Sequence, residues 1–195
     1  MRNVEYVILA AGASERMGFP KATTPLAGAS PIERVFRILE GRCVTIVTTQ
    51  ALEAACSRAT PGARVLVNGN PQTGMNSSLL TAHRSIDPGA TIGVLLADKP
   101  FVREETLARC ERALEDAPEC DVVFPVRGGE PGHPVYFAPR ARARLSGLPA
   151  GDTLRTVRDD PQLVRLRVEC FDAGISVDLD TPDAWRAAEC DVRHA

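Results

Sequence analysis

The sequence lacks the features that would place it among membrane, secreted or nucleic-acid-binding proteins. No apolar run approaches the roughly 18 residues that a membrane-spanning helix needs, and the first residues, MRNVEYVILAAG, show neither the apolar core nor the cleavage site of a signal peptide. The formal net charge is only −2 and basic residues are interspersed with acidic ones, so no broad basic stripe is available to bind nucleic-acid phosphates. These absences predict a cytoplasmic protein that binds neither membranes nor nucleic acids.

The sequence contains cysteines, but they lack the spacings that are typical of metal-binding sites or disulfide scaffolds. No two cysteines form a CxxC pair and none clusters with histidine, which argues against a zinc site and against a small disulfide scaffold. The sequence also shows no obvious Ser/His/Asp or Cys/His arrangement for nucleophilic catalysis. We therefore expect reduced cysteines, packed mostly in the core or on helix faces. The six are Cys43, Cys56, Cys110, Cys120, Cys170 and Cys190.

The sequence does contain a regular alternation of two kinds of segment. Short β-branched runs alternate with segments of helical period, which is typical of an α/β domain with a mostly parallel sheet. The runs are almost continuously apolar, as expected when helices cover both faces of the sheet. From the length we expect one domain, residues 1–195, of Rossmann-like three-layer α/β/α architecture, with antiparallel elements added in the C-terminal third. The expected strands are residues 4–10, 43–49, 63–67, 91–97 and 120–126, and the clearest helices are residues 30–41, started by Ser30, Pro31 and Glu33, and 103–117.

The loop after the first expected strand, LAAGASERMGFPK, is suited to hold an anion. Gly12 and Ala13 allow the backbone to approach a ligand closely, and the N–H groups of such a loop can form an anion-binding nest. Arg16 and Lys21 bring two cations to the same place. From spacing alone, a glycine-rich turn with two solvated cations remains an alternative.

This loop matches neither of the common phosphate-binding fingerprints. Ser14 stands where the GxGxxG pattern has its second glycine, and Gly18 is followed by Phe19 rather than by the lysine of GxxxxGK[ST]. In addition, no acidic residue closes the second strand to hold a ribose hydroxyl. A dinucleotide-dependent oxidoreductase is therefore not expected.

The same stretch closely resembles the LAAGxSxRMGxxK signature of the nucleotidyltransferases that make activated sugars, alditols and molybdenum cofactors, the MobA-like NTP transferases among them. The resemblance, which extends from Leu9 to Trp185, implies a fold of the nucleotide-diphospho-sugar transferase type. It also implies that Arg16 and Lys21 contact the phosphates of a bound nucleotide. The base and ribose would face the backbone of Leu9, Ala10, Ala11 and Gly12.

The loop after the third expected strand is a polar turn that leads into a helix. On local evidence, Asn76, Ser77 or Ser78 caps this helix, and His83 further along it is a packed or surface residue. The stretch GMNSSL, which begins at Gly74, is similar to the GMSSSL of molybdenum cofactor cytidylyltransferases and departs from it at Asn76. The resemblance implies contacts to base and ribose here, and the candidates are Asn70, Gln72, Gly74 and Ser77.

Two carboxylates are placed to hold a metal ion. Asp98 follows an apolar strand directly, and Asp178 and Asp180 alternate along an extended segment and so share one face. Oxygen ligands of this kind suit Mg²⁺, which takes one or two carboxylates together with phosphate oxygens and waters. Locally, Asp180 could equally be a helix cap, because Thr181 and Pro182 start a helix. The resemblance to the GDQP and DVDTP turns of the family implies that Asp98 and Asp180 bind Mg²⁺, with Asp98 catalytic together with Arg16 and Lys21.

The acceptor side departs from the family pattern at one residue. Lys99 stands where the family has Gln, which puts a cation near the expected metal and acceptor. The Lys99 side chain is expected either to point outward or to pair with an incoming phosphate. The stretches GHPVYF, with His133, and GD, with Asp152, resemble those that line the acceptor pocket of cytidylyltransferases, although locally His133 could be a plain turn residue. The resemblance implies transfer of a nucleoside monophosphate, CMP being favoured, from a nucleoside triphosphate to a phosphorylated acceptor such as molybdopterin. The alternatives are a nucleotidyltransferase for a sugar phosphate or another phosphorylated metabolite, and a nucleotide-binding protein without catalysis.

Overall fold

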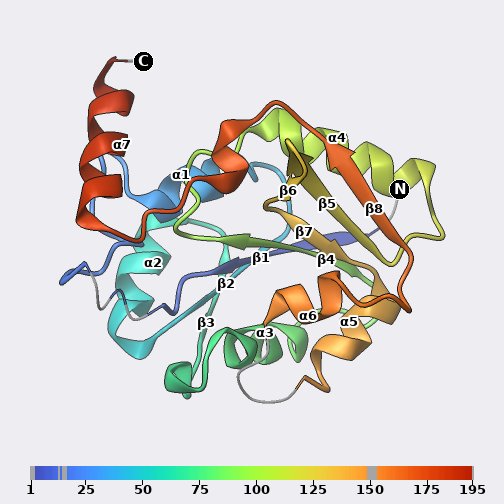
Figure 1. Cartoon of the computed structure of the whole chain (residues 1–195). Coiled ribbons are helices and arrows are strands. Elements are labelled where there is room, and N and C mark those ends of the chain that lie inside the picture. Colours follow the sequence, from blue (N-terminus) through green and yellow to red (C-terminus); the bar gives the residue numbers. More distant parts are fainter. Residues whose placement is uncertain (1–2, 13, 15–16, 149–152, 195) are drawn as a thin grey trace.

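The computed structural model describes residues 3–12, 14, 17–148 and 153–194. Its described strands form an eight-stranded sheet in the order β3-β2-β1-β4-β7-β5-β6, and β8 pairs with β5 (Figure 1). The strands are β1 (Val4–Leu9), β2 (Val44–Thr48), β3 (Arg64–Val67), β4 (Thr91–Leu96), β5 (Val122–Arg127), β6 (Glu130–Pro131), β7 (Val135–Phe137) and β8 (Arg165–Glu169).

The described part of the chain also contains seven α-helices and three 3-10 turns. Each of the five predicted strands and both predicted helices is present, to within a few residues at the ends. The helices are α1 (Pro31–Arg37), α2 (Glu53–Ala59), α3 (Met75–His83), α4 (Glu104–Asp116), α5 (Pro139–Leu145), α6 (Leu154–Arg158) and α7 (Pro182–His194). The 3-10 turns are η1 (Gln50–Leu52), η2 (Pro71–Thr73) and η3 (Ala173–Ser176).

The sheet is mixed but mostly parallel, as the alternating sequence predicts. β1 pairs in parallel with β2 and β4, β2 with β3, and β5 with β8. The short strand β7 lies between β4 and β5 and runs antiparallel to both, and β6 is antiparallel to β5. The antiparallel elements expected in the C-terminal part are therefore confirmed. Because the parallel strands end at the same edge, their following loops gather there.

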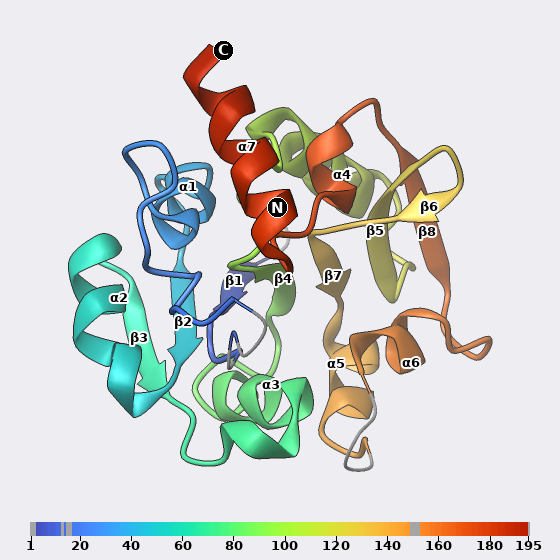
Figure 2. The same cartoon turned by 60° about the vertical axis from the view of Figure 1, so that its left-hand side comes forward.

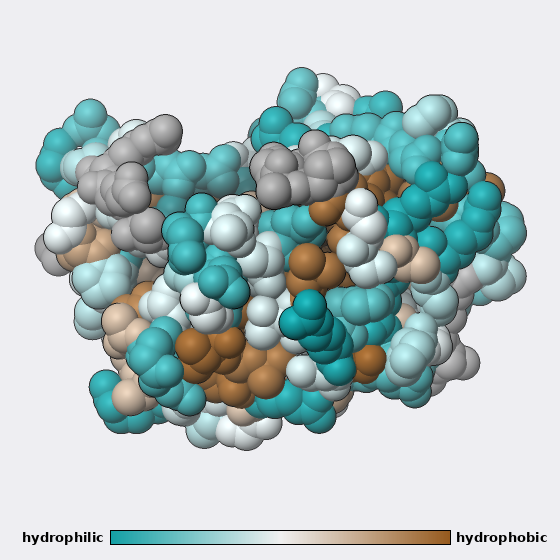
Figure 3. Space-filling view, turned by 90° about the horizontal axis from the view of Figure 1, so that it is seen from below, coloured by the Kyte–Doolittle hydropathy of each residue, from teal (hydrophilic) through white to brown (hydrophobic). Residues whose placement is uncertain are grey.

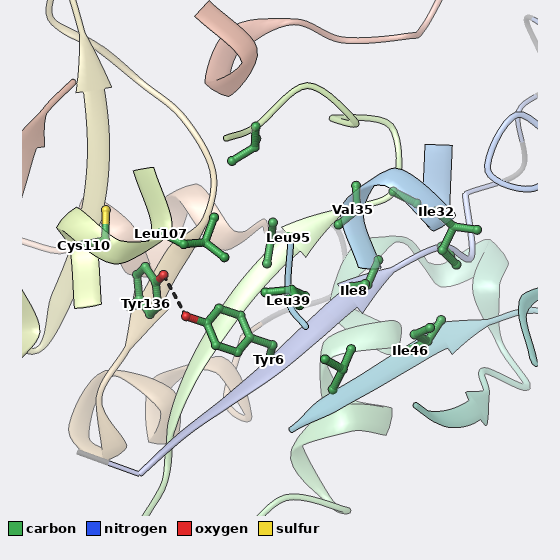
Figure 4. Close-up of a cluster of buried hydrophobic side chains, with 14 of the residues drawn as sticks. Tyr6, Ile8, Ile32, Val35, Leu39, Ile46, Leu95, Leu107, Cys110 and Tyr136 are labelled. Carbon is green, nitrogen blue, oxygen red and sulfur yellow. Dashed lines mark hydrogen bonds between the residues drawn. The ribbon is translucent and has the colours of Figure 1, made fainter. Parts of the chain in front are cut away.

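Helices cover both faces of the sheet, which confirms the three-layer architecture. Tyr6 and Ile8 point to a cluster that includes side chains of α1 and α4, where Tyr6 also meets Tyr136 of β7 (Figure 4). Val7 and Leu9 point to the opposite cluster, beneath α3, α5 and α6. Seen from that side, the outer surface of the molecule is largely hydrophilic with separate hydrophobic patches (Figure 3). Four of the six cysteines are buried in the interior, as expected.

A third, smaller cluster joins the C-terminal helix to the loop after β1. Trp185 and Ala188 of α7 pack with Met17 and Leu26, and the ring of Phe19 meets that of Trp185 edge to face at 5.1 Å between centroids. Figure 2 shows α7 rising from a start just above β1 and β4. The packing holds the loop after β1 close to the segment that precedes α7. No helix in the described ranges is long and apolar enough to span a membrane.

The helix starts show where local capping rules hold and where they fail. Ser30 precedes α1 as predicted, and its backbone N–H donates to the Glu33 carboxylate at 2.6 Å. The prediction for α3 was wrong: this helix begins at Met75, after Gly74, and none of Asn76, Ser77 and Ser78 is its N-cap. Gly74 has φ 95° and ψ −177°, a conformation that only glycine adopts readily, so backbone geometry rather than a capping side chain starts the helix.

Candidate active site

A pocket of about 340 Å³ opens where β1 and β4 end. The two strands are neighbours, and beyond their ends the N–H of Ala97 donates to the carbonyl of Leu9 at 3.0 Å. This contact brings the loop after β1 beside Asp98. The turn formed by η2 and the start of α3 closes the third side of the pocket, so that three segments far apart in the sequence meet there.

Most of the residues expected to contact the nucleotide line this pocket. Leu9, Ala10, Ala11 and Gly12 do so, as does Gly74. Arg16 lies outside the described residues. Pro71 rather than its neighbours Asn70 and Gln72 lines the pocket, and Ser78 does so instead of Ser77.

Hydrogen bonds within the turn explain the positions of the polar side chains. The hydroxyl of Ser77 donates towards the carbonyls of Gly74 at 2.7 Å and Asn70 at 3.0 Å, so it faces the backbone of its own turn. Asn68, buried at the end of β3, donates to Ser77 Oγ at 2.7 Å and to Ser78 Oγ at 2.9 Å. Sequence reasoning missed Asn68, although an amide directly after a strand is a recognisable signal. Asn76 donates to the carbonyl of Leu148 at 3.1 Å and thereby ties α3 to the end of α5.

Lys21 lies between two aspartates at one end of the pocket. Its Nζ is 2.8 Å from Asp98 Oδ2 and 2.5 Å from Asp180 Oδ1. The Lys21 side chain is 13% exposed, whereas that of Asp180 is 51% exposed. Burial lowers the pKa of Lys21, but the hydrogen bonds and charges of the two aspartates outweigh this, so the pKa lies above its usual value. Lys21 is therefore a fully charged ammonium at neutral pH.

The two aspartates also fit a divalent metal ion. Asp98 Oδ1 is buried and has no hydrogen-bond partner within the described part of the chain, while Oδ2 is held by Lys21. A buried carboxylate oxygen without a partner is costly unless a ligand supplies one. No group of three or more metal-ligating side chains occurs among the described residues. Mg²⁺ is commonly held by only one or two carboxylates, with phosphate oxygens and water as its other ligands.

A second ion pair lies beside the first. Lys99 Nζ is 2.6 Å from Asp178 Oδ1, and the Lys99 side chain is only 9% exposed. The sequence left open whether Lys99 points outward or pairs with an incoming phosphate. The outward position is wrong, because the carboxylate of Asp178 holds the Lys99 side chain within the structure. Asp178 and Asp180 share one face of their segment, as predicted, and each accepts one lysine. The chain contains only these two lysines, and both are here.

His133 lies close enough to the Lys99–Asp178 pair to feel the charges of both residues. Its Nδ1 is 3.1 Å from the carbonyl of Val94, which can only accept, so Nδ1 carries the proton and Nε2 presents a lone pair. Burial lowers the pKa of His133 to about 4, the hydrogen bond to Val94 opposes this, and the charge of Lys99 lowers the pKa further. The imidazole is therefore neutral at pH 7. Asp152, the other expected acceptor residue, lies outside the described residues.

The segment that carries Asp178 and Asp180 is fixed by close packing. A Cβ built on Gly174 would lie 1.9 Å from the carbonyl oxygen of Phe101, so only glycine fits at this place in η3. Asp172, buried just before η3, accepts from the N–H of Arg103 at 2.8 Å and from Thr106 Oγ1 at 2.7 Å. Sequence reasoning missed Asp172, whose partners lie 66 and 69 residues away.

After this fixed turn, the chain continues into α7. Leu179 is fully buried, and its N–H donates to the carbonyl of Asp98 at 3.2 Å. Thr181 Oγ1 accepts from the N–H of Ala184 at 3.2 Å. Thr181 therefore supplies a hydroxyl that caps α7, and the carboxylate of Asp180 accepts from Lys21.

The fold and this site define a nucleotidyltransferase-type α/β protein with its site at the carboxyl ends of the central strands. More particularly, the chain belongs to the MobA-like NTP transferase family, whose model matches residues 6–166. A curated relative, nicotine blue oxidoreductase of Paenarthrobacter nicotinovorans, is 32% identical over 187 residues, which are 90% of this chain and 91% of that protein.

Solved structures show the same architecture. The chain matches the crystal structure of Rv0371c from Mycobacterium tuberculosis at 25% identity with a TM-score of 0.77, covering 96% of this chain and 97% of that one. Rv0371c has also been solved as a complex with manganese. Molybdopterin-guanine dinucleotide biosynthesis protein A from Archaeoglobus fulgidus matches at 19% identity with a TM-score of 0.75, covering 98% of this chain and all of that one.

Proposed function

We propose that this protein transfers a nucleoside monophosphate, with CMP favoured, from a nucleoside triphosphate to a phosphorylated small molecule such as molybdopterin, releasing pyrophosphate. The observation that carries the proposal is Lys21 between Asp98 and Asp180 at one end of a pocket lined by the loop after β1. This cluster of one cation and two carboxylates supports a triphosphate and a metal ion bound at that end of the pocket. Family membership and the manganese complex of Rv0371c support a divalent metal at these carboxylates.

The reaction needs positioning and charge neutralisation rather than a proton-abstracting side chain. A phosphate oxygen of the acceptor attacks the α-phosphorus, a new P–O bond forms, and the bond to the β-phosphate oxygen breaks with pyrophosphate leaving in line. A phosphomonoester has a second pKa near 6, so it is largely dianionic at pH 7 and already nucleophilic. This is consistent with the neutral imidazole of His133, whose low pKa makes it a weak base.

Each group at the site has a proposed part in this reaction. The backbone of the loop after β1, including Gly12, holds the nucleotide, and Lys21 together with Arg16 neutralises phosphate charge. Asp98 and Asp180 hold Mg²⁺, which when bound withdraws charge from the phosphate oxygens. In this arrangement the basic side chains neutralise the phosphates and the two aspartates position the metal ion, and no side chain needs to take up a proton.

On the acceptor side, Lys99, His133 and Asp152 are the proposed binding residues. His133 Nε2 offers a hydrogen-bond acceptor, and the Lys99–Asp178 pair offers a fixed dipole. These groups lie beside the Lys21 cluster that is proposed to hold the triphosphate. They are therefore the part of the site that selects the acceptor.

The preference for cytidine is supported by the GHPVYF and DLDTP stretches, whereas the Archaeoglobus fulgidus protein is named for a guanine dinucleotide. The test is pyrophosphate release measured for CTP, GTP, UTP and ATP, each with Mg²⁺ or Mn²⁺, against a panel of phosphorylated acceptors that includes molybdopterin. The expected result is turnover with CTP and at least one acceptor. A nucleotide-induced rise in melting temperature without turnover on any acceptor would instead favour a binding protein.

A second candidate function is a redox reaction of a small molecule in the same pocket. The observation that favours it is the 32% identity with a protein named nicotine blue oxidoreductase along almost the whole chain. The structure gives no ribose-binding carboxylate at the end of β2, where Thr48 is followed by Thr49 and Gln50. Oxidation of NADH or NADPH, followed at 340 nm with a dye as electron acceptor, separates the two candidates.

A further inference from the structure

The two expected metal ligands are already bridged by a cation of the chain itself. Lys21 Nζ lies within hydrogen-bond distance of both Asp98 Oδ2 and Asp180 Oδ1. A divalent ion that used both carboxylates would need these same oxygens, or at least the space between them. An ammonium and a metal ion cannot share that space, because both are positive and both require the same lone pairs.

Lys21 thus occupies the position between the two carboxylates that a metal ion bound to both would take. Displacing the ammonium would leave it partly buried, with its side chain 13% exposed, and without its two counter-charges. Such an uncompensated charge is strongly unfavourable. Asp98 Oδ1, buried without a partner among the described residues, remains as the position from which a metal could begin to bind.

A triphosphate removes this obstacle because it offers Lys21 another partner. Lys21 lines the same pocket as Gly12 and Asp98, so rotation about its side-chain bonds would turn the ammonium towards a phosphate bound there. The backbone at this point is a turn, held by N–H donation from Thr23 and Thr24 to the carbonyl of Pro20. Lysine suits such an exchange, since its ammonium is a compact charge without the rigid fork that arginine uses to clamp carboxylates.

We propose that Lys21 couples metal binding to nucleotide binding: it blocks the carboxylates of Asp98 and Asp180 in the free protein and releases them when a triphosphate takes up its ammonium. This inference rests on the proposed function, since it assumes a triphosphate in the pocket. It predicts weak metal binding by the free protein and mutual strengthening of nucleotide and metal binding, because such coupling is reciprocal.

The first test measures Mn²⁺ binding to the free protein by electron paramagnetic resonance, without nucleotide. Lys21→Met is expected to bind Mn²⁺ about tenfold or more tightly than the unmodified protein, within the usual range of coupling between two sites. Lys99→Met is the matched control, because it removes the same charge from the same cluster but frees Asp178 instead. Its effect is expected to stay below about threefold, because Lys99 pairs with the half-exposed carboxylate of Asp178 and not with Asp98 or Asp180.

Two results of this test would overturn the blocking role. One is unchanged or weaker Mn²⁺ binding in Lys21→Met, and the other is equal tightening in Lys99→Met, which would mean that overall charge rather than occupancy controls the site. Circular dichroism checks that each variant is folded. If Lys21→Met does not fold, Lys21→Gln replaces it in the same comparison.

The second test follows the release step directly and uses the presence of only two lysines in the chain. Protein labelled with ¹³C at lysine Cε gives two side-chain signals, which the variants assign. Saturation with CTP in the presence of EDTA is expected to shift the Lys21 signal and leave that of Lys99 in place. An unmoved Lys21 signal at a nucleotide concentration shown by calorimetry to saturate the protein would overturn the release. Failure of every nucleotide to bind would overturn the proposed function together with the release step, whereas the Mn²⁺ comparison tests the blocking role independently.

Discussion

The two lysines of this chain, Lys21 and Lys99, form neighbouring ion pairs but have different surroundings. Lys21 is shared by two carboxylates, one of them half exposed, next to an open pocket of about 340 Å³. Lys99 has one carboxylate partner, and its charge acts on the buried, neutral His133. The difference supports the proposed division of the site, in which the nucleotide side has a cation with two carboxylate partners beside an open pocket and the acceptor side has a cation held by one carboxylate.

The largest expected effect on activity comes from removing the carboxylate of Asp98, on the proposed nucleotide side. Asp98→Ala removes one partner of Lys21 and one proposed metal ligand, so pyrophosphate release should fall by about 10³-fold, as when a preorganised charge-stabilising group is lost. The assay is steady-state pyrophosphate release with CTP and the best acceptor. Asp178→Asn, on the acceptor side, is the matched control and should retain far more activity.

Full activity in Asp98→Ala would contradict the metal assignment. The fold should be unchanged, because the Asp98 side chain contacts Lys21 and the pocket rather than the core. Unfolding in urea, followed by circular dichroism, checks this.

The next largest effect comes from the turn that positions both ion pairs. In Gly174→Ala, the new Cβ would lie 1.9 Å from the carbonyl oxygen of Phe101, and backbone atoms cannot yield as a flexible side chain does. The free energy of unfolding should fall by about 3 kcal/mol, at the upper end of the usual cost of overpacking. The segment with Asp178 and Asp180 should also shift, lowering activity.

Gly89→Ala is the control for that substitution. A Cβ there would meet only the Asp87 carboxylate at 3.5 Å, an ordinary contact. Its unfolding free energy should change by no more than about 0.5 kcal/mol. Equal stability of the two variants would show that η3 can move aside, and would remove the argument that it fixes the aspartates.

Sequence reasoning succeeded where a property is local. The strands were recognisable because each is an almost continuous apolar run, and Asp98 stood out because a charge directly follows such a run. The short strand β7, by contrast, lies between β4 and β5, and its pairing depends on contacts that no local period encodes. The helix start at Gly74 was missed because a backbone conformation, not a polar side chain, sets it.

The charged contacts of the site were the least predictable feature. The sequence indicated that Asp178 and Asp180 share a face, but not that one accepts Lys99 and the other Lys21. Which distant charges meet depends on the packing of η3 and on Asp172, whose hydrogen bonds reach the start of α4. A sequence pattern shows how residues are spaced along one helix or strand, whereas an ion pair between distant residues forms only in the assembled fold.

His133, on the proposed acceptor side, should cause a smaller effect, which appears in the pH dependence of the free energy of unfolding. Burial keeps His133 neutral in the folded protein, with a pKa of about 4, while in the unfolded chain it titrates near 6.5. Between these values the unfolded state binds the extra proton, so stability is lost as pH falls from 6.5 towards 4. The unfolding free energy should therefore be lower at pH 5 than at pH 7 by about 2 kcal/mol from this residue.

The measurement is urea unfolding of the protein and of His133→Asn at both pH values. Asparagine keeps a donor for the carbonyl of Val94 but does not titrate, so it should lose about 2 kcal/mol less on acidification. Identical pH dependence of the two proteins would mean that His133 is accessible to protons in the folded state.

The smallest expected effect tests whether the fixed lysine has any part on the nucleotide side. Lys99→Gln introduces the residue typical of the related turn and breaks the pair with Asp178. Since the Asp178 side chain is 50% exposed, the carboxylate left behind stays hydrated, and stability should change by less than about 1 kcal/mol. The KM for the acceptor should change by about tenfold, which corresponds to one charged hydrogen bond, and the KM for CTP should not change. A shift in the KM for CTP with an unchanged KM for the acceptor would reverse the assignment of the two lysines, because Lys99 would then serve the triphosphate.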